Sequence, residues 1–381
     1  MRLTDRLRPA PTSMPSVVID GSALSSVAAH SGIGTYVRNL LAALAAGPDL
    51  KVSVSALAEP QVVLPSGVGR RTIHRRCKSR PRAEVVEHAM RLPWDDRMRR
   101  AAGEVFHEPG FHAPWGVRRP KVQTLLDVIP LVLDEPDLAV LRQRWRRFGP
   151  RYREADAVIA ISRYTAEEGI RLLGLDPGRV FVAPLGVDPV FRPDGRHEPA
   201  EGSPYLLVVG EYSRRKGFPE AFAALDAVAD AGYPHHLKVV GRIHDHAREE
   251  LLRLRASSRH PERIELLGHV PDLAATYRGA TAVLMTTHYE GFGLPAVEAM
   301  ASGTPVVAFA NTAVTEVVGG GGVLVADGDV AAMVAALRRV LDSPAAREEL
   351  SAQGLDRASA FTWAAAAAVH ADVYRLAAGM A

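Results

Sequence analysis

Short runs of aliphatic and β-branched residues alternate with Ala- and Leu-rich stretches along all 381 residues, and this alternation restricts the fold more than any other feature. In the first half of the chain, strands are expected at residues 16–19, 51–57, 121–125 and 157–161. In the second half they are expected at residues 205–209, 237–240, 264–267, 282–285 and 305–308. Mostly apolar strands separated by helices are typical of parallel sheets covered on both faces. The sequence therefore predicts an α/β fold with two doubly wound domains, joined by the Pro- and Gly-rich segment at 186–199.

The segment at 287–304 carries the most specific motif. Glu290 and Glu298 flank a Gly-Phe-Gly-Leu-Pro sequence at 291–295. Glycine lets backbone N–H groups approach a ligand closely, and proline is favoured in a first helical turn. We therefore expect a loop that presents amides to a polar ligand, followed by a helix that Pro295 starts and that carries Glu298 in its first turn. Taken singly, the glycines could build a tight turn and Glu298 could favour a helix start.

This motif resembles the signature of the retaining GT-B glycosyltransferases of family 4, and the resemblance extends from Gly32 to Trp363. It implies the GT-B architecture, in which two Rossmann-like domains face each other across a cleft. Residues 1–190 would form the acceptor-side domain and residues 191–361 the nucleotide-sugar domain, with a helix at 362–378 crossing back onto the first. It also implies a hexosyltransferase that retains anomeric configuration and needs no cofactor and no metal.

The resemblance assigns catalytic roles to four residues. His107, in a loop at 106–110, would reach the reacting sugar, and Glu290 would bind a hydroxyl of the donor sugar. Arg215 and Lys216 would bind the donor phosphates. Two departures from the family pattern accompany them: Glu211 stands where many members have an arginine, and Leu126 replaces a histidine.

Further residues are assigned to binding. The Gly-X-Gly at residues 32–34 precedes a helix expected through residue 44, and a helix N-terminus is a natural seat for an anion. By resemblance, Val270 would bind the base, Glu298 the ribose and Glu316 the donor. The donor-binding set is Gly32, Gly34, Gly210, Arg242, Val270, Gly291, Phe292, Gly293, Leu294 and Glu298. The acceptor-side residues are Tyr36 and Asp127.

Charge is distributed unevenly. Residues 1–195 hold 29 Lys and Arg against 21 Asp and Glu, a charge of +8, and the remaining residues hold 17 against 22, a charge of −5. A basic first half could bind an anionic acceptor, an acidic membrane surface or nucleic acid, or could simply be solvated. No nucleic-acid motif accompanies the charge, so nucleic acid is not expected as a partner.

Location is predicted from what the sequence lacks. It holds no long apolar span and no apolar signal segment near Met1, and its single cysteine, Cys77, cannot form an internal disulfide. We expect a cytoplasmic protein with peripheral contact to the inner face of the membrane.

Other interpretations remain open. Asp327 and Asp329 form an Asp-X-Asp string that holds metal in other nucleotide-sugar enzymes, but its position favours a turn and a helix cap. Two doubly wound halves also suit an NAD(P)-dependent dehydrogenase, although the glycine motif at 32–37 lacks its third glycine. A catalytically silent nucleotide-sugar-binding protein is a further alternative. GDP-mannose is the leading donor, with UDP- and dTDP-sugars open, and the acceptor could be a glycan, a lipid-linked glycan or a small natural product.

Overall fold

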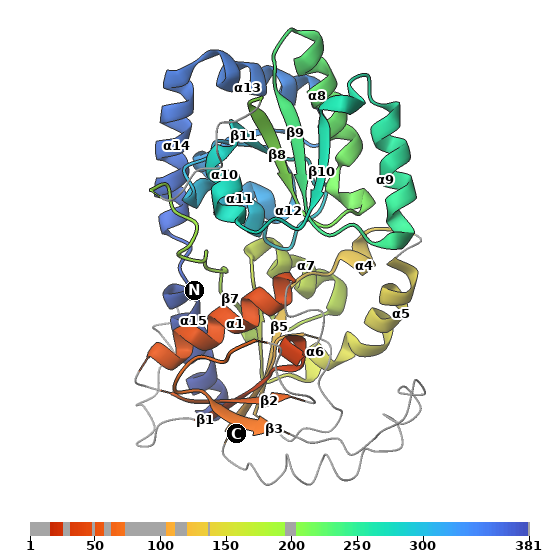
Figure 1. Cartoon of the computed structure of the whole chain (residues 1–381). Helices are drawn as coiled ribbons and strands as arrows, with labels where there is room; N and C mark the ends of the chain where they lie inside the picture. Colours follow the sequence, from red (N-terminus) through yellow and green to blue (C-terminus); the bar gives the residue numbers. More distant parts are fainter. Residues whose placement is uncertain are drawn as a thin grey trace. The chain divides into compact units, whose positions relative to one another are not determined.

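The computed structural model describes residues 16–25, 31–47, 50–56, 62–72, 104–110, 120–135, 138–194 and 203–379. The chain divides into two compact units: Met1–Gly186 together with Trp363–Ala381, and Val187–Thr362. The sequence had placed the boundary after residue 190 and the returning helix at 362. Figure 1 labels the elements of both units.

Within the described residues, the first unit holds a sheet of seven strands in the order β3-β2-β1-β4-β5-β6-β7. All neighbouring strands are parallel. Chain order reverses between β1 and β4, which makes this the switch point of the sheet. The strands are β1 Ser16–Asp20, β2 Lys51–Ala56, β3 Gly69–Thr72, β4 Glu104–Glu108, β5 Lys121–Leu125, β6 Ala157–Ala160 and β7 Val180–Val182.

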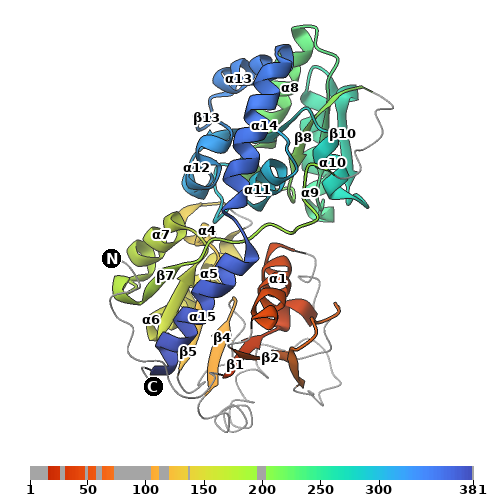
Figure 2. The ribbon, with the colours of Figure 1, turned by 90° about the vertical axis from the view of Figure 1, so that its left-hand side faces the viewer.

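The last helix of the chain, α15, belongs to this first unit. It packs on α1 and contacts β4, β5 and β6, and Figure 2 shows it running along the sheet. The described helices of the unit are η2 Ser22–Ser25, α1 Gly32–Ala46, α4 Ile129–Val132, α5 Ala139–Phe148, α6 Pro150–Glu154, α7 Arg163–Leu173, η5 Pro177–Arg179 and α15 Trp363–Gly379.

The second unit contains, in its described part, a six-stranded parallel sheet in the order β10-β9-β8-β11-β12-β13. Its switch point lies between β8 and β11. The strands are β8 Tyr205–Val209, β9 His236–Val240, β10 Ile264–Gly268, β11 Ala282–Met285, β12 Val306–Ala310 and β13 Val323–Ala326.

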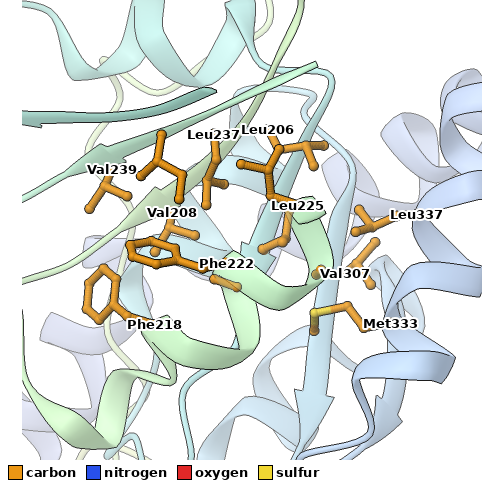
Figure 3. Close-up of a cluster of buried hydrophobic side chains, with 14 of the residues drawn as sticks. Leu206, Val208, Phe218, Phe222, Leu225, Leu237, Val239, Val307, Met333 and Leu337 are labelled. Carbon is orange, nitrogen blue, oxygen red and sulfur yellow. The ribbon is translucent and has the colours of Figure 1, made fainter. Parts of the chain in front are cut away.

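Helices cover both faces of this second sheet. One face packs on α8, α9 and α13 through a buried cluster that includes Phe218, Phe222, Leu225, Met333 and Leu337 (Figure 3). The helices are η6 Arg214–Lys216, α8 Phe218–Asp230, α9 Asp245–Ser257, η7 Pro261–Arg263, α10 Leu273–Gly279, α11 Leu294–Ala301, α12 Thr312–Val318, η8 Gly319–Gly321, α13 Val330–Asp342 and α14 Pro344–Ser359.

All nine predicted strands are present, with ends that differ by a residue or two, and the doubly wound α/β class is confirmed. Four strands were not predicted. β3 and β4 carry charged residues that break an apolar run, β7 has only three residues, and β13 follows four glycines. In the parts of the chain that the structure describes, no helix has the length and apolar character needed to cross a bilayer. Cys77 and most of the Lys and Arg residues before residue 120 lie outside the described residues.

Candidate functional site

The carboxyl ends of β8 and β11 carry most of the polar residues that the sequence singled out in the second unit. In doubly wound sheets, ligands bind at the carboxyl edge near the switch point. The turn η6, with Arg215 and Lys216, follows β8, and the loop with Glu290 follows β11. Two backbone contacts join these segments, because His288 N donates to Arg215 O at 2.7 Å and Thr286 Oγ1 donates to Lys216 O at 3.0 Å.

Glu290 is the centre of a buried charge cluster. It is 9% exposed, its Oε1 contacts Lys216 Nζ, and its Oε2 lies 3.4 Å from Arg215 NH1. Burial alone would raise the pKa of Glu290, but the charges of Lys216 and Arg215 outweigh it and hold the pKa below its usual range. Burial, with help from Arg215, lowers the pKa of Lys216, while Glu290 opposes that shift. Two cations and one carboxylate leave the cluster with a net positive charge.

Two glycines permit the close approach of these loops. A Cβ on Gly217 would lie 2.0 Å from Thr286 O, and Gly217 has a φ of 63°. A Cβ on Gly241, at the end of β9, would lie 2.0 Å from Gly210 O. Any larger residue at either position would separate the strand ends, so the sequence must hold glycine there.

Two residues that sequence reasoning missed hold the backbone of Glu290 in place. Glu290 N donates to Thr312 Oγ1 at 3.1 Å, and Thr312 donates in turn to Asn311 Oδ1 at 3.0 Å. Thr312 has a φ of 41°, which is strained for a β-branched residue. The available signal was a polar pair directly after a buried strand, β12, which neighbours β11 in the sheet.

Glu298 lies in α11, which begins at Leu294 rather than at Pro295, so the prediction that Glu298 occupies the first helical turn is wrong. Its Oε2 accepts a hydrogen bond of 2.9 Å from Tyr277 OH. Burial raises the pKa of Glu298 to about 7, and the nearby charge of Asp188 adds to this rise. The folded protein therefore holds the proton of this carboxyl to a higher pH than the unfolded chain does.

Replacing Glu298 with glutamine is expected to stabilise the second unit at alkaline pH. Because the folded state holds this proton more tightly than the unfolded chain, the stability it contributes is full below about pH 4.5 and is lost as the pH rises through 7. Glu298→Gln should be more stable than wild type by about 2–3 kcal/mol at pH 8.5 and by much less at pH 5. Urea unfolding followed by circular dichroism measures this difference. If the free energies of unfolding of Glu298→Gln and wild type differed equally at both pH values, the raised pKa of Glu298 would be contradicted.

The remaining residues that the sequence predicts for the donor side lie along the same edge of the sheet. Gly210 follows β8, and Arg242 follows β9 with its side chain exposed. Val270 is half-buried between β10 and the cap of α10, where Asp272 accepts from Ala275 N at 2.9 Å. Gly291 and Phe292 are buried beside α11, with Phe292 edge-on to Phe361, and Gly293 and Leu294 begin that helix. Glu316 lies in α12, and Glu211 pairs with His244 at 2.6 Å.

The Asp327-Gly328-Asp329 string forms a turn and a cap, as predicted. Asp329 Oδ1 accepts from Ala332 N at the start of α13, and Gly328 has a φ of 74°. Asp327 instead contacts His288 and Asn311. Over the described ranges, no three His, Cys, Asp or Glu side chains gather as metal ligands would.

In the first unit, the position and the burial of His107 differ from those predicted. It lies on β4 rather than in a loop, and it is fully buried. Its Nε2 bonds Thr124 Oγ1 and its Nδ1 bonds Tyr374 OH, each at 2.7 Å. Burial lowers the pKa of His107 well below its usual value. With no exposed surface and both ring nitrogens paired, His107 cannot touch a sugar in this conformation.

Tyr36 belongs to the same buried network, where its hydroxyl lies 2.7 Å from both Thr124 Oγ1 and His370 Nε2. The other predicted residues of this unit fall at helix starts. Gly32 begins α1 and Gly34 is buried in its first turn, while Asp127 Oδ1 accepts from Ile129 N at the start of α4. The predicted helix is present, but the Gly-X-Gly forms its first turn rather than preceding it.

The direction of every hydrogen bond in this network follows from one carbonyl group. Burial lowers the pKa values of His107 and His370, so both rings are neutral and each has a single N–H. Ala366 O can only accept, so His370 Nδ1 donates to it and His370 Nε2 accepts from Tyr36 OH. Tyr36 then accepts from Thr124, which accepts from His107 Nε2, and His107 Nδ1 accepts from Tyr374 OH. This chain of hydrogen bonds begins and ends on α15.

Two family models match the chain over most of its length. The model described as Glycosyl transferases group 1 matches residues 193–357, and the model described as Glycosyltransferase Family 4 matches residues 30–191. A glycogen synthase of Mycobacterium tuberculosis is 34% identical over 58% of this chain and 54% of its own length. An O-antigen chain mannosyltransferase B of Escherichia coli is 28% identical over 76% of this chain and 78% of its own. The chain thus spans about half the length of the first of these relatives.

Solved structures share the fold. A sucrose-phosphate synthase from Thermosynechococcus elongatus has a TM-score of 0.78 at 24% identity, covering 96% of this chain and 100% of its own. WaaG, a glycosyltransferase involved in lipopolysaccharide biosynthesis, has a TM-score of 0.72 at 15% identity, covering 94% of this chain and 99% of its own. At this level of identity the likeness concerns the architecture.

Proposed function

Because the chain belongs to the GT-B glycosyltransferases of family 4, we propose that it transfers a hexose from a nucleotide diphosphate donor to an acceptor hydroxyl with retention of configuration. The observation that carries this proposal is the buried Lys216–Glu290–Arg215 cluster at the switch point of the second sheet. Its net positive charge suits a ligand that bears phosphates.

The Lys216–Glu290–Arg215 cluster supplies the positive charge that a departing diphosphate requires. As the bond between the anomeric carbon and the diphosphate oxygen breaks, negative charge grows on the leaving oxygens, and fixed cations stabilise it. The acceptor oxygen forms its bond to the anomeric carbon on the same face, and its proton passes to a donor phosphate oxygen. Arg215 and Lys216 would contact the phosphates, and Glu290 would hold both cations in place and accept from a sugar hydroxyl. No metal ion enters this scheme.

GDP-mannose is the first donor to test, because two relatives are named as mannosyltransferases, the O-antigen enzyme of Escherichia coli and an MMP alpha-(1->4)-mannosyltransferase of Mycolicibacterium hassiacum. UDP-sugars and dTDP-sugars are the next donors to test. A glycan, a glycolipid or a small natural product would serve as acceptor. Glu298, beside Tyr277, would bind the ribose.

We also propose peripheral contact with acidic lipid through α5. Val140 is 70% exposed and Leu141 is 43% exposed at its start. Arg144, Arg146 and Arg147 are exposed on the following turns. Apolar side chains beside cations match an anionic bilayer surface. Cosedimentation with phosphatidylglycerol vesicles, compared with phosphatidylcholine vesicles, tests this contact.

Thermal unfolding with UDP, GDP, dTDP, NAD⁺ and NADP⁺, each in the presence of EDTA, tests the proposed function. We expect one nucleoside diphosphate to raise the melting temperature and the two dinucleotides to leave it unchanged, since ligands stabilise the state that binds them. Slow hydrolysis of the matching nucleotide-sugar without acceptor would separate an enzyme from a silent binding protein. Binding of NAD⁺ alone, or a strict need for magnesium, would contradict the proposal.

A further inference from the structure

His288 has contacts that the proposed function does not use. It lies in the loop after β11, two residues before Glu290, and its backbone N–H donates to Arg215 O. Its ring stacks on Phe309, with centroids 5.8 Å apart. Its Nδ1 lies 3.0 Å from Asp327 Oδ1, and its Nε2 lies 3.2 Å from Glu220 Oε1. The ring thus joins the loop to α8, to β12 and to the turn after β13.

Both ring nitrogens of His288 face carboxylates, and this determines which protonation state of the ring can hydrogen-bond to both. An ionised carboxylate only accepts hydrogen bonds, whereas a neutral imidazole has a single N–H and would turn one lone pair toward an acceptor. Only the imidazolium donates to Glu220 and Asp327 together. Asp327 Oδ1 also accepts from Asn311 Nδ2 at 2.7 Å, and the second oxygen of Glu220 is buried without a hydrogen-bond partner. A single positive charge between these two carboxylates attracts both and reduces their mutual repulsion.

We propose that His288 is a positioning residue that, when protonated, clamps the loop carrying Glu290 through Glu220 and Asp327. Loss of the proton as the pH rises breaks one of the two contacts and loosens the loop. Glu220 comes from α8 and Asp327 from the turn before α13, and the neighbouring Asn311 and Phe309 carry no charge. The effect on catalysis rests on the proposed function, but the effect on the loop does not.

Hydrogen exchange of the segment at 286–293, corrected for the intrinsic pH dependence of exchange, tests the clamp without any ligand. In wild type, protection of the His288 and Glu290 amides should fall about three- to tenfold between pH 5.5 and 9, the size of effect that two partly exposed ion pairs give. His288→Gln should show the lower protection at both pH values. Asp327→Asn, which keeps the acceptor for Asn311, should abolish most of the pH dependence.

His260 provides a matched control. It also faces two carboxylates, with Nε2 2.7 Å from Asp230 and Nδ1 3.6 Å from Glu262, but it lies outside this loop. His260→Gln should leave the exchange of residues 286–293 unchanged. If protection of the loop does not depend on pH, or if His288→Gln exchanges like wild type, the clamp is overturned.

Binding of whichever nucleoside diphosphate wild type binds provides a second readout. Affinity should fall between pH 5.5 and 9 in wild type, and His288→Gln should bind at both pH values as weakly as wild type does at pH 9. No binding by wild type at any pH would contradict the proposed function, and the exchange experiment would still decide the clamp. Binding that is unaffected by His288→Gln at pH 5.5 would count against the clamp alone.

Discussion

Lys216→Ala and Glu290→Ala are each expected to reduce sugar transfer by about 10³-fold or more, which corresponds to roughly 4 kcal/mol of transition-state stabilisation. Lys216→Ala removes the cation nearest to Glu290. Glu290→Ala leaves Lys216 and Arg215 close together without their shared carboxylate, so their mutual repulsion moves them from the positions that a diphosphate would require. Steady-state transfer with the donor found by thermal unfolding measures both losses.

Arg214→Ala is the matched control for this experiment. Arg214 lies in the same turn, but its side chain is 60% exposed and contacts Glu250 on α9. Its removal should change transfer by no more than about twofold, because exposed ion pairs contribute about 0–1 kcal/mol. Circular dichroism must show that each variant folds. Near wild-type transfer by both Lys216→Ala and Glu290→Ala would show that the site has been assigned to the wrong residues.

Tyr36→Phe is expected to destabilise the first unit by about 2–3 kcal/mol, although it removes only one oxygen. The Tyr36 hydroxyl accepts from Thr124 and donates to His370, so its loss leaves the buried O–H of Thr124 and the buried Nε2 of His370 without a hydrogen-bond partner. All four tryptophans of the chain fall in the first unit, so tryptophan fluorescence during urea unfolding reports on that unit.

Tyr233→Phe is the comparison for this loss. The Tyr233 hydroxyl donates to Asp342 at an exposed position, and water can replace that bond. Its removal should cost about 0.5–1.5 kcal/mol in the second unit, followed by circular dichroism. A loss from Tyr36→Phe no larger than this would mean that the buried hydrogen-bond chain does not fasten α15.

Lowering the pH should weaken the buried hydrogen-bond network that joins Tyr36 and His370. Burial lowers the pKa of His370 to about 4, so the stability that the neutral ring contributes is full above about pH 6.5 and is lost as the pH falls toward 4. This loss amounts to about 3 kcal/mol. The first unit should therefore unfold in acid before its carboxylates are fully protonated.

The clustering of Lys216, Glu290 and Arg215 could be predicted from sequence because each of them lies shortly after a recognisable strand. Arg215 and Lys216 follow one strand, and Glu290 follows another strand that the parallel topology places beside it. The apolar runs fixed the strands, and the carboxyl edge brought the charges together. The position of Glu298 in its helix was wrong by one residue, because proline occupies the second helical position rather than the first.

His107 shows what the sequence could not predict. Its motif resembles a loop, yet burial of β4 against α15 turns the ring into the core. Its partners are 17 and 267 residues away, so no local pattern marks them. His288 was visible within the motif, but Glu220 and Asp327 lie 68 and 39 residues away. Sequence patterns reveal strand ends well and distant side-chain partners poorly.

The position of α15 has a consequence for the order in which the protein is made. Residues 363–379 complete the first unit, but a ribosome reaches them only after it has translated the whole of the second. At roughly 5–20 residues per second, roughly 10–70 s pass between the synthesis of Tyr36, Thr124 and His107 and that of His370 and Tyr374. The second unit can therefore finish folding first, and the nascent first unit is the part that needs protection by chaperones.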